Sequence, residues 1–220
     1  MKFIDIYIMR SKCYKQIKYF IFIIHILKCI KNIYIYIHII NMMFQYLLLL
    51  YFVFVNSKDV IIPVSQLDIK NYLGHWLQVY QAPTNVIFQG YGTCITADYG
   101  ILDNGNINVI NTQINKDDEI EQINGYGYYK NISEPGKLTV HLEGVPVDSP
   151  YWVIKLGEST NNQYQYTIIT TPSGISLWVL VRDLSTFFEL YNEEVIDFLD
   201  NYNFKYETVS QTNCNYKFKN

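Results

Sequence analysis

From Trp76 onward, the chain consists of short segments in which apolar and polar residues alternate, separated by turn residues at intervals of about ten. Alternation with a period of two places successive side chains on opposite faces of a sheet. The clearest example is 137–143, where Leu138, Val140 and Leu142 share one face. The turn Asp103-Asn104-Gly105 is typical of an antiparallel hairpin. The pattern predicts eight strands, at 76–82, 92–102, 107–114, 119–130, 137–143, 151–156, 164–171 and 175–182.

The period changes after the last of these strands. Val195, Phe198, Leu199 and Tyr202 follow the spacing i, i+3, i+4, i+7, which predicts an amphipathic helix over 191–202. Eight strands make a barrel just wide enough to hold one small ligand. We therefore expect an all-β antiparallel barrel or sandwich with one helix packed on its outside.

Residues 1–57 differ from the rest in composition. They are rich in Ile, Tyr, Phe and Leu and carry seven of the seventeen Lys and Arg residues but only one acid, Asp5. The remainder, 58–220, holds 10 basic and 19 acidic residues, a net charge of −9. An acidic domain argues against nucleic-acid binding, because phosphate contacts need a basic face.

The extension 1–57 contains an apolar run at 46–55 that resembles the hydrophobic core of a signal peptide, with Val55-x-Ser57 as a cleavage site. The first 41 residues show no turn pattern, and we interpret them as an upstream extension of the reading frame. The alternative is an uncleaved signal anchor over 33–55, with Lys28 and Lys31 on its cytosolic flank. Either interpretation sends 58–220, the expected folded domain, to the secretory lumen or the outside.

Cys94 and Cys214 are the two cysteines of that domain. An even pair in an oxidising compartment favours a disulfide, and two free thiols remain the alternative. One cysteine pair offers too few ligands for a metal site, so no metal or cofactor is expected.

Two short motifs stand about a hundred residues apart. Gly74-His75-Trp76 opens the first strand, and the apolar strand at 177–181 ends in Arg182. Together they resemble the outer motifs of the lipocalins, particularly those of the apolipoprotein D and bacterial type, over about residues 62–216. The resemblance implies an up-and-down barrel of eight antiparallel strands with one C-terminal flanking helix. It also implies that Arg182 stacks on Trp76 at the closed end, as a structural contact.

The same resemblance implies a disulfide between Cys94 and Cys214, with 208–214 pairing back on the barrel. It also implies glycosylation at Asn131, in the sequon Asn131-Ile132-Ser133. The chain departs from the family pattern at 155–159, where the usual Thr-Asp-Tyr is absent, and at 183–185, which lacks the usual Pro. Both departures affect loops.

Alternation also predicts a lining for the barrel. If the apolar faces of 92–102 and 151–156 point inward, Tyr99 and Trp152 face the interior. The family resemblance assigns Tyr99, Asn111 and Trp152 to the ligand pocket; the alternative is that they are ordinary core aromatics and a strand Asn. Few charges fall on these faces, so we expect a mostly apolar ligand with a neutral or amphipathic head. A fatty acid would need a cation near the mouth, and none can be assigned.

The resulting hypothesis is an extracellular, monomeric carrier of a small hydrophobic molecule such as a fatty acid, lysolipid, sterol or retinoid. Catalytic motifs are missing; of the two histidines of the domain, we assign His141 to the surface and interpret His75 as exposed or capping. Two alternatives stay open: an enzyme on the same barrel, or an interaction module with a filled barrel. Val145 and Val147 form either a loop with buried valines, which we favour, or a lip touching membrane or lipoprotein.

Overall fold

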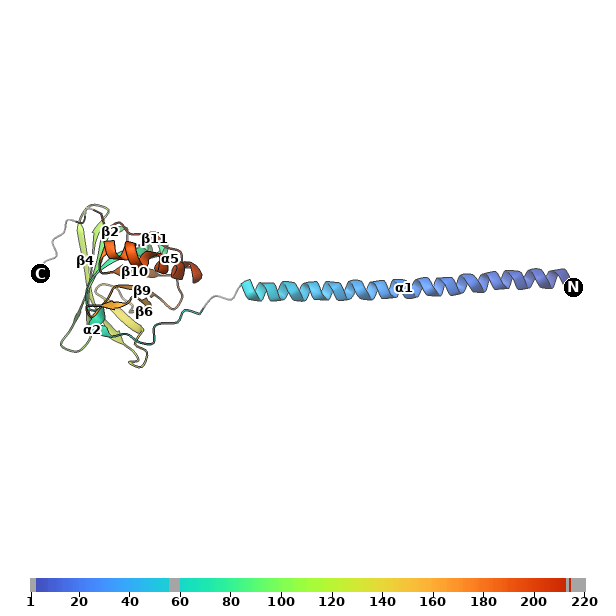
Figure 1. Cartoon of the computed structure of the whole chain (residues 1–220), viewed down its shortest axis with the longest axis horizontal. Helices are drawn as coiled ribbons and strands as arrows, with labels where there is room; N and C mark the ends of the chain where they lie inside the picture. Colours follow the sequence, from blue (N-terminus) through green and yellow to red (C-terminus); the bar gives the residue numbers. More distant parts are fainter. Residues whose placement is uncertain (1–2, 56–59, 213, 215–220) are drawn as a thin grey trace. The chain divides into compact units, whose positions relative to one another are not determined.

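The computed structural model describes residues 3–55, 60–212 and 214, in two compact units, Met1–Lys58 and Asp59–Asn220. The described residues of the first unit form one helix, α1 (Phe3–Val55), which includes residues 3–41 (Figure 1). Within it, His25–Tyr51 is 27 residues long with a mean hydropathy of 1.7, long and apolar enough to cross a membrane. A signal sequence near an N-terminus meets the same criteria.

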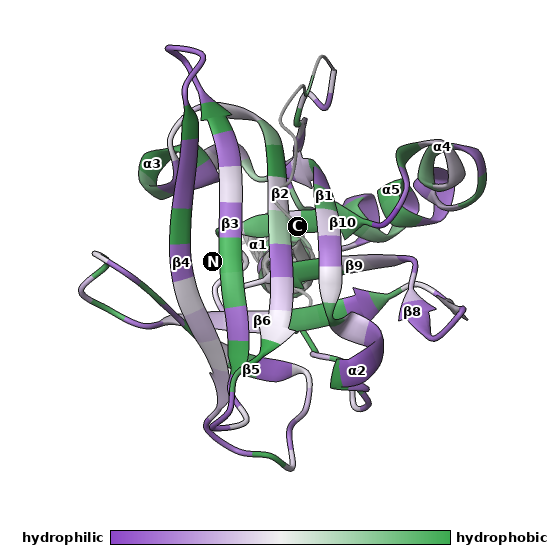
Figure 2. Cartoon of the chain, turned by 90° about the vertical axis from the view of Figure 1, so that its left-hand side faces the viewer, coloured by the Kyte–Doolittle hydropathy of each residue, from purple (hydrophilic) through white to green (hydrophobic). Residues whose placement is uncertain are grey.

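The second unit is a closed antiparallel barrel of eight strands, which confirms the predicted fold class (Figure 2). Neighbours in sequence pair around the wall, and β10 pairs with β1 to close it. The strands are β1 (Gly74–Gln81), β2 (Gly92–Ile101), β3 (Ile107–Asn115), β4 (Ile120–Tyr129), β5 (Lys137–Leu142), β6 (Ser149–Leu156), β9 (Tyr166–Thr170) and β10 (Leu177–Val181).

The smaller elements lie at the ends and on one side of the barrel (Figure 2). They are α2 (Ile69–Tyr72), η1 (Pro83–Asn85), α3 (Val86–Gln89), β7 (Ser159–Thr160), β8 (Gln163–Tyr164), α4 (Leu184–Thr186), η2 (Phe187–Tyr191), α5 (Asn192–Asn201) and β11 (Glu207–Thr208). The predicted helix corresponds to α5, and α4 and η2, which precede it, were not expected.

The barrel wall is apolar on both faces where α5 covers it. Val195 and Leu199 of α5 are fully buried against an outer cluster that includes Ile168 and Val179. A second cluster fills the interior near the closed end and includes Trp76 and Leu180. Because apolar residues are buried on both sides of these strands, apolarity alone does not distinguish inside from outside there.

The C-terminal segment is tied to the barrel as the resemblance implied. β11 pairs with β1, and the N–H of Cys94 donates to the carbonyl of Ser210 at 2.7 Å. A disulfide joins Cys94 and Cys214, whose Cα atoms are 5.5 Å apart. It anchors the end of the chain to the start of β2, next to a bulge between Thr93 and Thr96.

Candidate ligand-binding cavity

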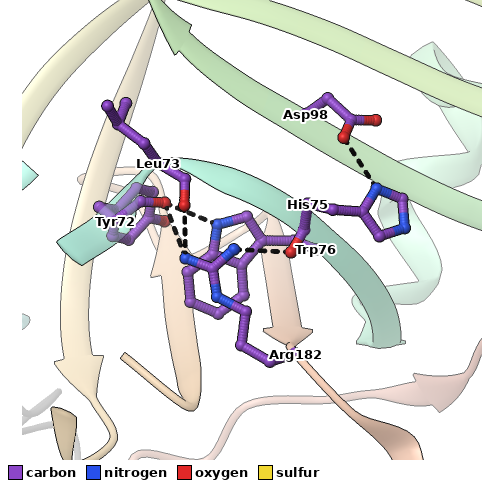
Figure 3. A network of polar contacts seen from close by, with 6 residues as sticks. All are labelled: Tyr72, Leu73, His75, Trp76, Asp98 and Arg182. Carbon is purple, nitrogen blue, oxygen red and sulfur yellow. Dashed lines mark hydrogen bonds and ion pairs between the residues drawn. The ribbon is translucent and has the colours of Figure 1, made fainter. Parts of the chain in front are cut away.

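The closed end of the barrel is built around Trp76, which is completely buried. The guanidinium of Arg182 lies over its indole, 3.6 Å from the ring centroid (Figure 3). The indole Nε1 donates to the carbonyl of Tyr72 at 2.8 Å. Gly74 has φ +95°, a conformation that favours glycine, and an added Cβ would lie 3.4 Å from Nη1 of Arg182. The backbone conformation therefore accounts for the glycine of the motif, because the added Cβ would make only an ordinary contact with the arginine.

Arg182 also fixes the chain around that end. It donates to five backbone carbonyls: His75 at 2.6 Å, Leu73 at 2.7 Å, Tyr72 and Tyr164 at 3.2 Å, and Asn71 at 3.3 Å. Burial lowers the pKa of Arg182 to about 10, so the guanidinium stays charged at neutral pH. The guanidinium is engaged in these structural contacts, and Arg182 does not line the cavity described next.

A cavity of about 750 Å³ occupies the barrel interior. That volume falls within the range of small-molecule sites in proteins. Its middle is apolar and is contributed by alternate residues of several strands, namely Ala97, Val109, Ile123, Val140, Leu142 and Leu180. The cavity can therefore bury an apolar body of moderate size.

The floor of the cavity is a cluster of tyrosine hydroxyls. The Tyr151 hydroxyl lies 3.0 Å from that of Tyr99 and 2.7 Å from that of Tyr72, which reaches Thr167 Oγ1 at 3.3 Å. Burial raises the pKa of Tyr99 to about 12, and it also raises the pKa values of Tyr72 and Tyr151. Tyr99 and Tyr151 thus present neutral hydroxyls to the cavity, able to donate to or accept from a polar atom of a ligand.

The mouth is more polar, and α3 lies beside it. Trp178 Nε1 donates to Gln89 Oε1 at 3.0 Å, and Gln113 Nε2 donates to the Gln89 carbonyl at 3.0 Å. Phe88 contacts the Trp178 indole, with ring centroids 6.3 Å apart. These contacts hold α3 against the inner wall, so its position controls part of the opening.

Two of the three expected pocket residues line the cavity. Tyr99 lies at the floor and Asn111 higher on the wall, opposite Ala97 in the β2–β3 register. Trp152 does not line it, and its assignment to the interior is corrected. Its indole belongs to the outer cluster with α5, and Lys137 Nζ lies 5.1 Å from its ring centroid. Tyr151 takes the inward position instead.

Trp178 also lines the cavity and was not predicted to do so. It lies two residues before Leu180 and four before Arg182, so the three side chains share one face of the strand. Because Arg182 stacks on the interior Trp76, the alternation of β10 identifies Trp178 as an inward residue. In β6 no motif residue of known orientation indicates which face points inward. A register irregularity between Val153 and Lys155 also interrupts the alternation there.

Asn131 and the two histidines lie outside the cavity lining, and both histidines are partly buried. Asn131 is exposed in the β4–β5 turn. His75 and His141 each lie 2.8 Å from a carboxylate, those of Asp98 and Asp148. The preference for buried valines in the β5–β6 loop was wrong, since Val145 is 38% exposed and Val147 71%. Among the described residues, no group of three or more His, Cys, Asp or Glu could hold a metal ion.

Comparisons with known proteins agree with this architecture. The family model described as a lipocalin-like domain matches residues 67–195. Apolipoprotein D of Rattus norvegicus is 38% identical over 93 residues, which are 42% of this chain and 48% of that protein. The outer membrane lipoprotein Blc of Vibrio cholerae is 30% identical over 143 residues, 61% of this chain and 80% of that protein. The chain spans about half the length of the rat and mouse relatives it matches.

Solved structures show the same fold. The cockroach allergen Per a 4 superposes with a TM-score of 0.52 at 21% identity, covering 68% of this chain and 92% of that one. Apocrustacyanin C2 superposes with a TM-score of 0.50 at 18% identity, covering 66% and 81%. The family model covers more than half of the chain, the closed barrel has the expected stacked Trp and Arg, and the chain therefore belongs to the lipocalin family.

Proposed function

We propose that the barrel is an extracellular carrier that buries a small, mostly apolar molecule. The observation that carries this proposal is the cavity of about 750 Å³ with an apolar middle. Burial of apolar surface contributes roughly 25 cal/mol per Å², so a ligand of moderate size would bind without any covalent step. A barrel filled by its own side chains, the interaction-module alternative, would lack such a cavity.

We assign the recognition of the ligand's polar atoms to Tyr99, Tyr151 and Asn111. The two hydroxyls at the floor and the amide on the wall are neutral groups in an otherwise apolar surface. A few such groups fix the orientation of a ligand, while the apolar wall supplies affinity. One relative, apolipoprotein D, is named as the protein component of a lipoprotein, which supports a lipid-like ligand.

Export is the second part of the proposal. The disulfide between Cys94 and Cys214 suits an oxidising compartment. The helix α1 would act as a signal that is removed at about residue 57 or as an anchor that remains. Asn131, exposed in its sequon, would then carry a glycan. N-terminal sequencing of the exported protein distinguishes removal from retention.

The open end would also contact a lipid surface. Its loops expose Ile87 (81%), Phe88 (60%), Tyr91 (76%), Val147 (71%) and Ile175 (60%). Exposed apolar groups around a cavity mouth suit contact with the membrane or lipoprotein from which the ligand is taken. Flotation with phosphatidylcholine vesicles tests this, and charged substitutions at Phe88 and Val147 should abolish it.

The decisive experiment is native mass spectrometry of the protein exported by a eukaryotic host expressing the full chain, followed by solvent extraction and lipid analysis. A stoichiometric lipid, sterol or pigment supports the carrier and names its class. Ile123→Trp, which fills the cavity, should block uptake, whereas the adjacent outward Asn124→Trp should not. An exported barrel that is empty and binds no lipid of a broad panel contradicts the proposal.

A further inference from the structure

Polarity in the cavity rises from its apolar middle to its mouth along β3 and β4. On β3 the inward series runs from Val109 through Asn111 to Gln113, and on β4 it runs from Ile123 to Glu121. Glu143, directly after β5, lines the same opening. These two glutamates are the charged residues of the lining, which contains no Lys, Arg or His within the described part of the chain.

Glu121 is held in place as an anion. Gln113 Nε2 donates to its Oε2 at 3.0 Å, and Asn115 Nδ2 donates to its Oε1 at 2.8 Å. Both amides stabilise the ionised form, and they lower the pKa of Glu121. Neither Glu121 nor Glu143 takes part in any of the four ion pairs between described residues. The mouth therefore presents two carboxylates that form no ion pair with a cation in the described part of the barrel.

Three cations among the described residues of the barrel are engaged elsewhere. Arg182 is bonded to carbonyls behind Trp76, Lys137 pairs with Glu134 on the outside, and Lys155 pairs with Glu194 of α5. The cation nearest in sequence to the mouth strands is Lys116, in the β3–β4 turn. It is exposed and is followed by three acids at 117–119, which leave that turn at a charge of −2.

We infer that the mouth selects ligands by charge: Glu121 and Glu143 favour an amphiphile with an ammonium head and an apolar tail, accept a neutral head, and disfavour a carboxylate. This inference rests on the proposed carrier function and specifies its ligand class. The tail would fill the apolar middle of the cavity while the head stays at the rim between the two carboxylates. Charges a few ångströms apart at a partly solvated site change affinity by about tenfold or more, and salt reduces the effect.

The test compares three probes with one tail: dodecylammonium, dodecanol and dodecanoate, each below its micelle concentration. Binding to the exported protein is measured by displacement of the neutral fluorophore N-phenyl-1-naphthylamine at low and high salt. We expect dodecylammonium to bind at least tenfold more tightly than dodecanoate at low salt, with dodecanol between them. The ratio should shrink as salt is added.

Two matched variants locate the effect. Glu121→Gln with Glu143→Gln should bring the three affinities within about threefold of one another, leaving dodecanol unchanged. Asp117→Asn with Asp118→Asn removes the same charge from the open end outside the cavity lining and should retain most of the preference. An equal loss in both variants would assign the preference to the general field of the acidic barrel and overturn the role of the two glutamates.

The outcomes also separate this inference from the carrier proposal. If dodecanoate binds as tightly as dodecylammonium while the fluorophore and dodecanol bind, the charge selection is wrong and the carrier stands. If neither the fluorophore nor any dodecyl probe binds, the carrier proposal fails and the inference fails with it.

Discussion

Tyr151 and Trp152 are adjacent in β6 and face opposite sides of the barrel wall. The Tyr151 hydroxyl lies 3.0 Å from that of Tyr99 at the cavity floor, while the Trp152 ring packs outside, under the ammonium of Lys137. Of these two neighbouring aromatic side chains, one therefore lines the cavity and the other packs on the outside of the barrel. Their separation determines which tryptophan can report on a ligand.

Ligand binding should alter the fluorescence of Trp178 and leave that of Trp152 nearly unchanged. Trp178 lines the cavity beside α3, whereas Trp152 belongs to the outer cluster. In a titration with N-phenyl-1-naphthylamine, Trp178→Phe should remove most of the binding-induced quenching, and Trp152→Phe should retain it. The reverse result would place the ligand outside the described cavity.

Replacing Arg182 should destabilise the barrel strongly. Arg182→Met removes the stacked cation over Trp76 and the five hydrogen bonds that Arg182 donates to backbone carbonyls. The free energy of unfolding should fall by about 2–4 kcal/mol, measured by urea denaturation. Lys155→Met, which breaks a partly exposed pair with Glu194, should cost about 1 kcal/mol or less. An equal decrease in unfolding free energy in the two variants would show that the closed-end contacts stabilise the barrel no more than a surface ion pair does.

Loss of the disulfide should lower the free energy of unfolding more than loss of a surface contact does. The bond closes a loop between residues 120 apart in sequence, and the chain-entropy model gives it about 4–5 kcal/mol. The double variant Cys94→Ser and Cys214→Ser should show that decrease in guanidinium denaturation. Wild-type protein unfolded with a reducing agent should match the variant, and an unchanged midpoint in reducing agent would argue that the thiols are not joined.

Alkaline pH should lower the stability of the barrel, because Tyr99 at the cavity floor loses its proton more readily in the unfolded chain than in the folded one. Burial raises the pKa of Tyr99 from about 10 to about 12, so the unfolded chain releases this proton first. Stability is therefore retained below pH 10 and falls between pH 10 and 12, by up to about 2–3 kcal/mol for this group. Unfolding midpoints measured from pH 8 to 12 should fall less steeply in Tyr99→Phe. Parallel profiles for the two proteins would contradict this role.

Most of the barrel follows from local patterns. Alternation and turn residues placed all eight strands to within a few residues, because one inward and one outward face are imposed on every strand. The motif residues Trp76 and Arg182 and the cysteine pair lie where the resemblance implied. The positions of Tyr99 and Asn111 in the lining also agree, since their strands lie away from α5.

The side of Trp152 could not be predicted, because α5 makes the outer face of β6 as apolar as the inner one. The part played by α3 was also missed. It depends on hydrogen bonds between Gln89 and residues far away in sequence, such as Trp178, which no local pattern records. The tyrosine cluster likewise joins Tyr72, Tyr99 and Tyr151 from three separate elements.

Closure of the wall sets an order on folding. β1 can pair with β10 only after residue 181 has been made, more than a hundred residues after Trp76. Until then the nascent sheet has two open edges, and the indole of Trp76 lacks the guanidinium that covers it. Contacts of such long sequence separation form slowly, so the folding barrel exposes unpaired strands and apolar surface for longer than a helical protein of this size.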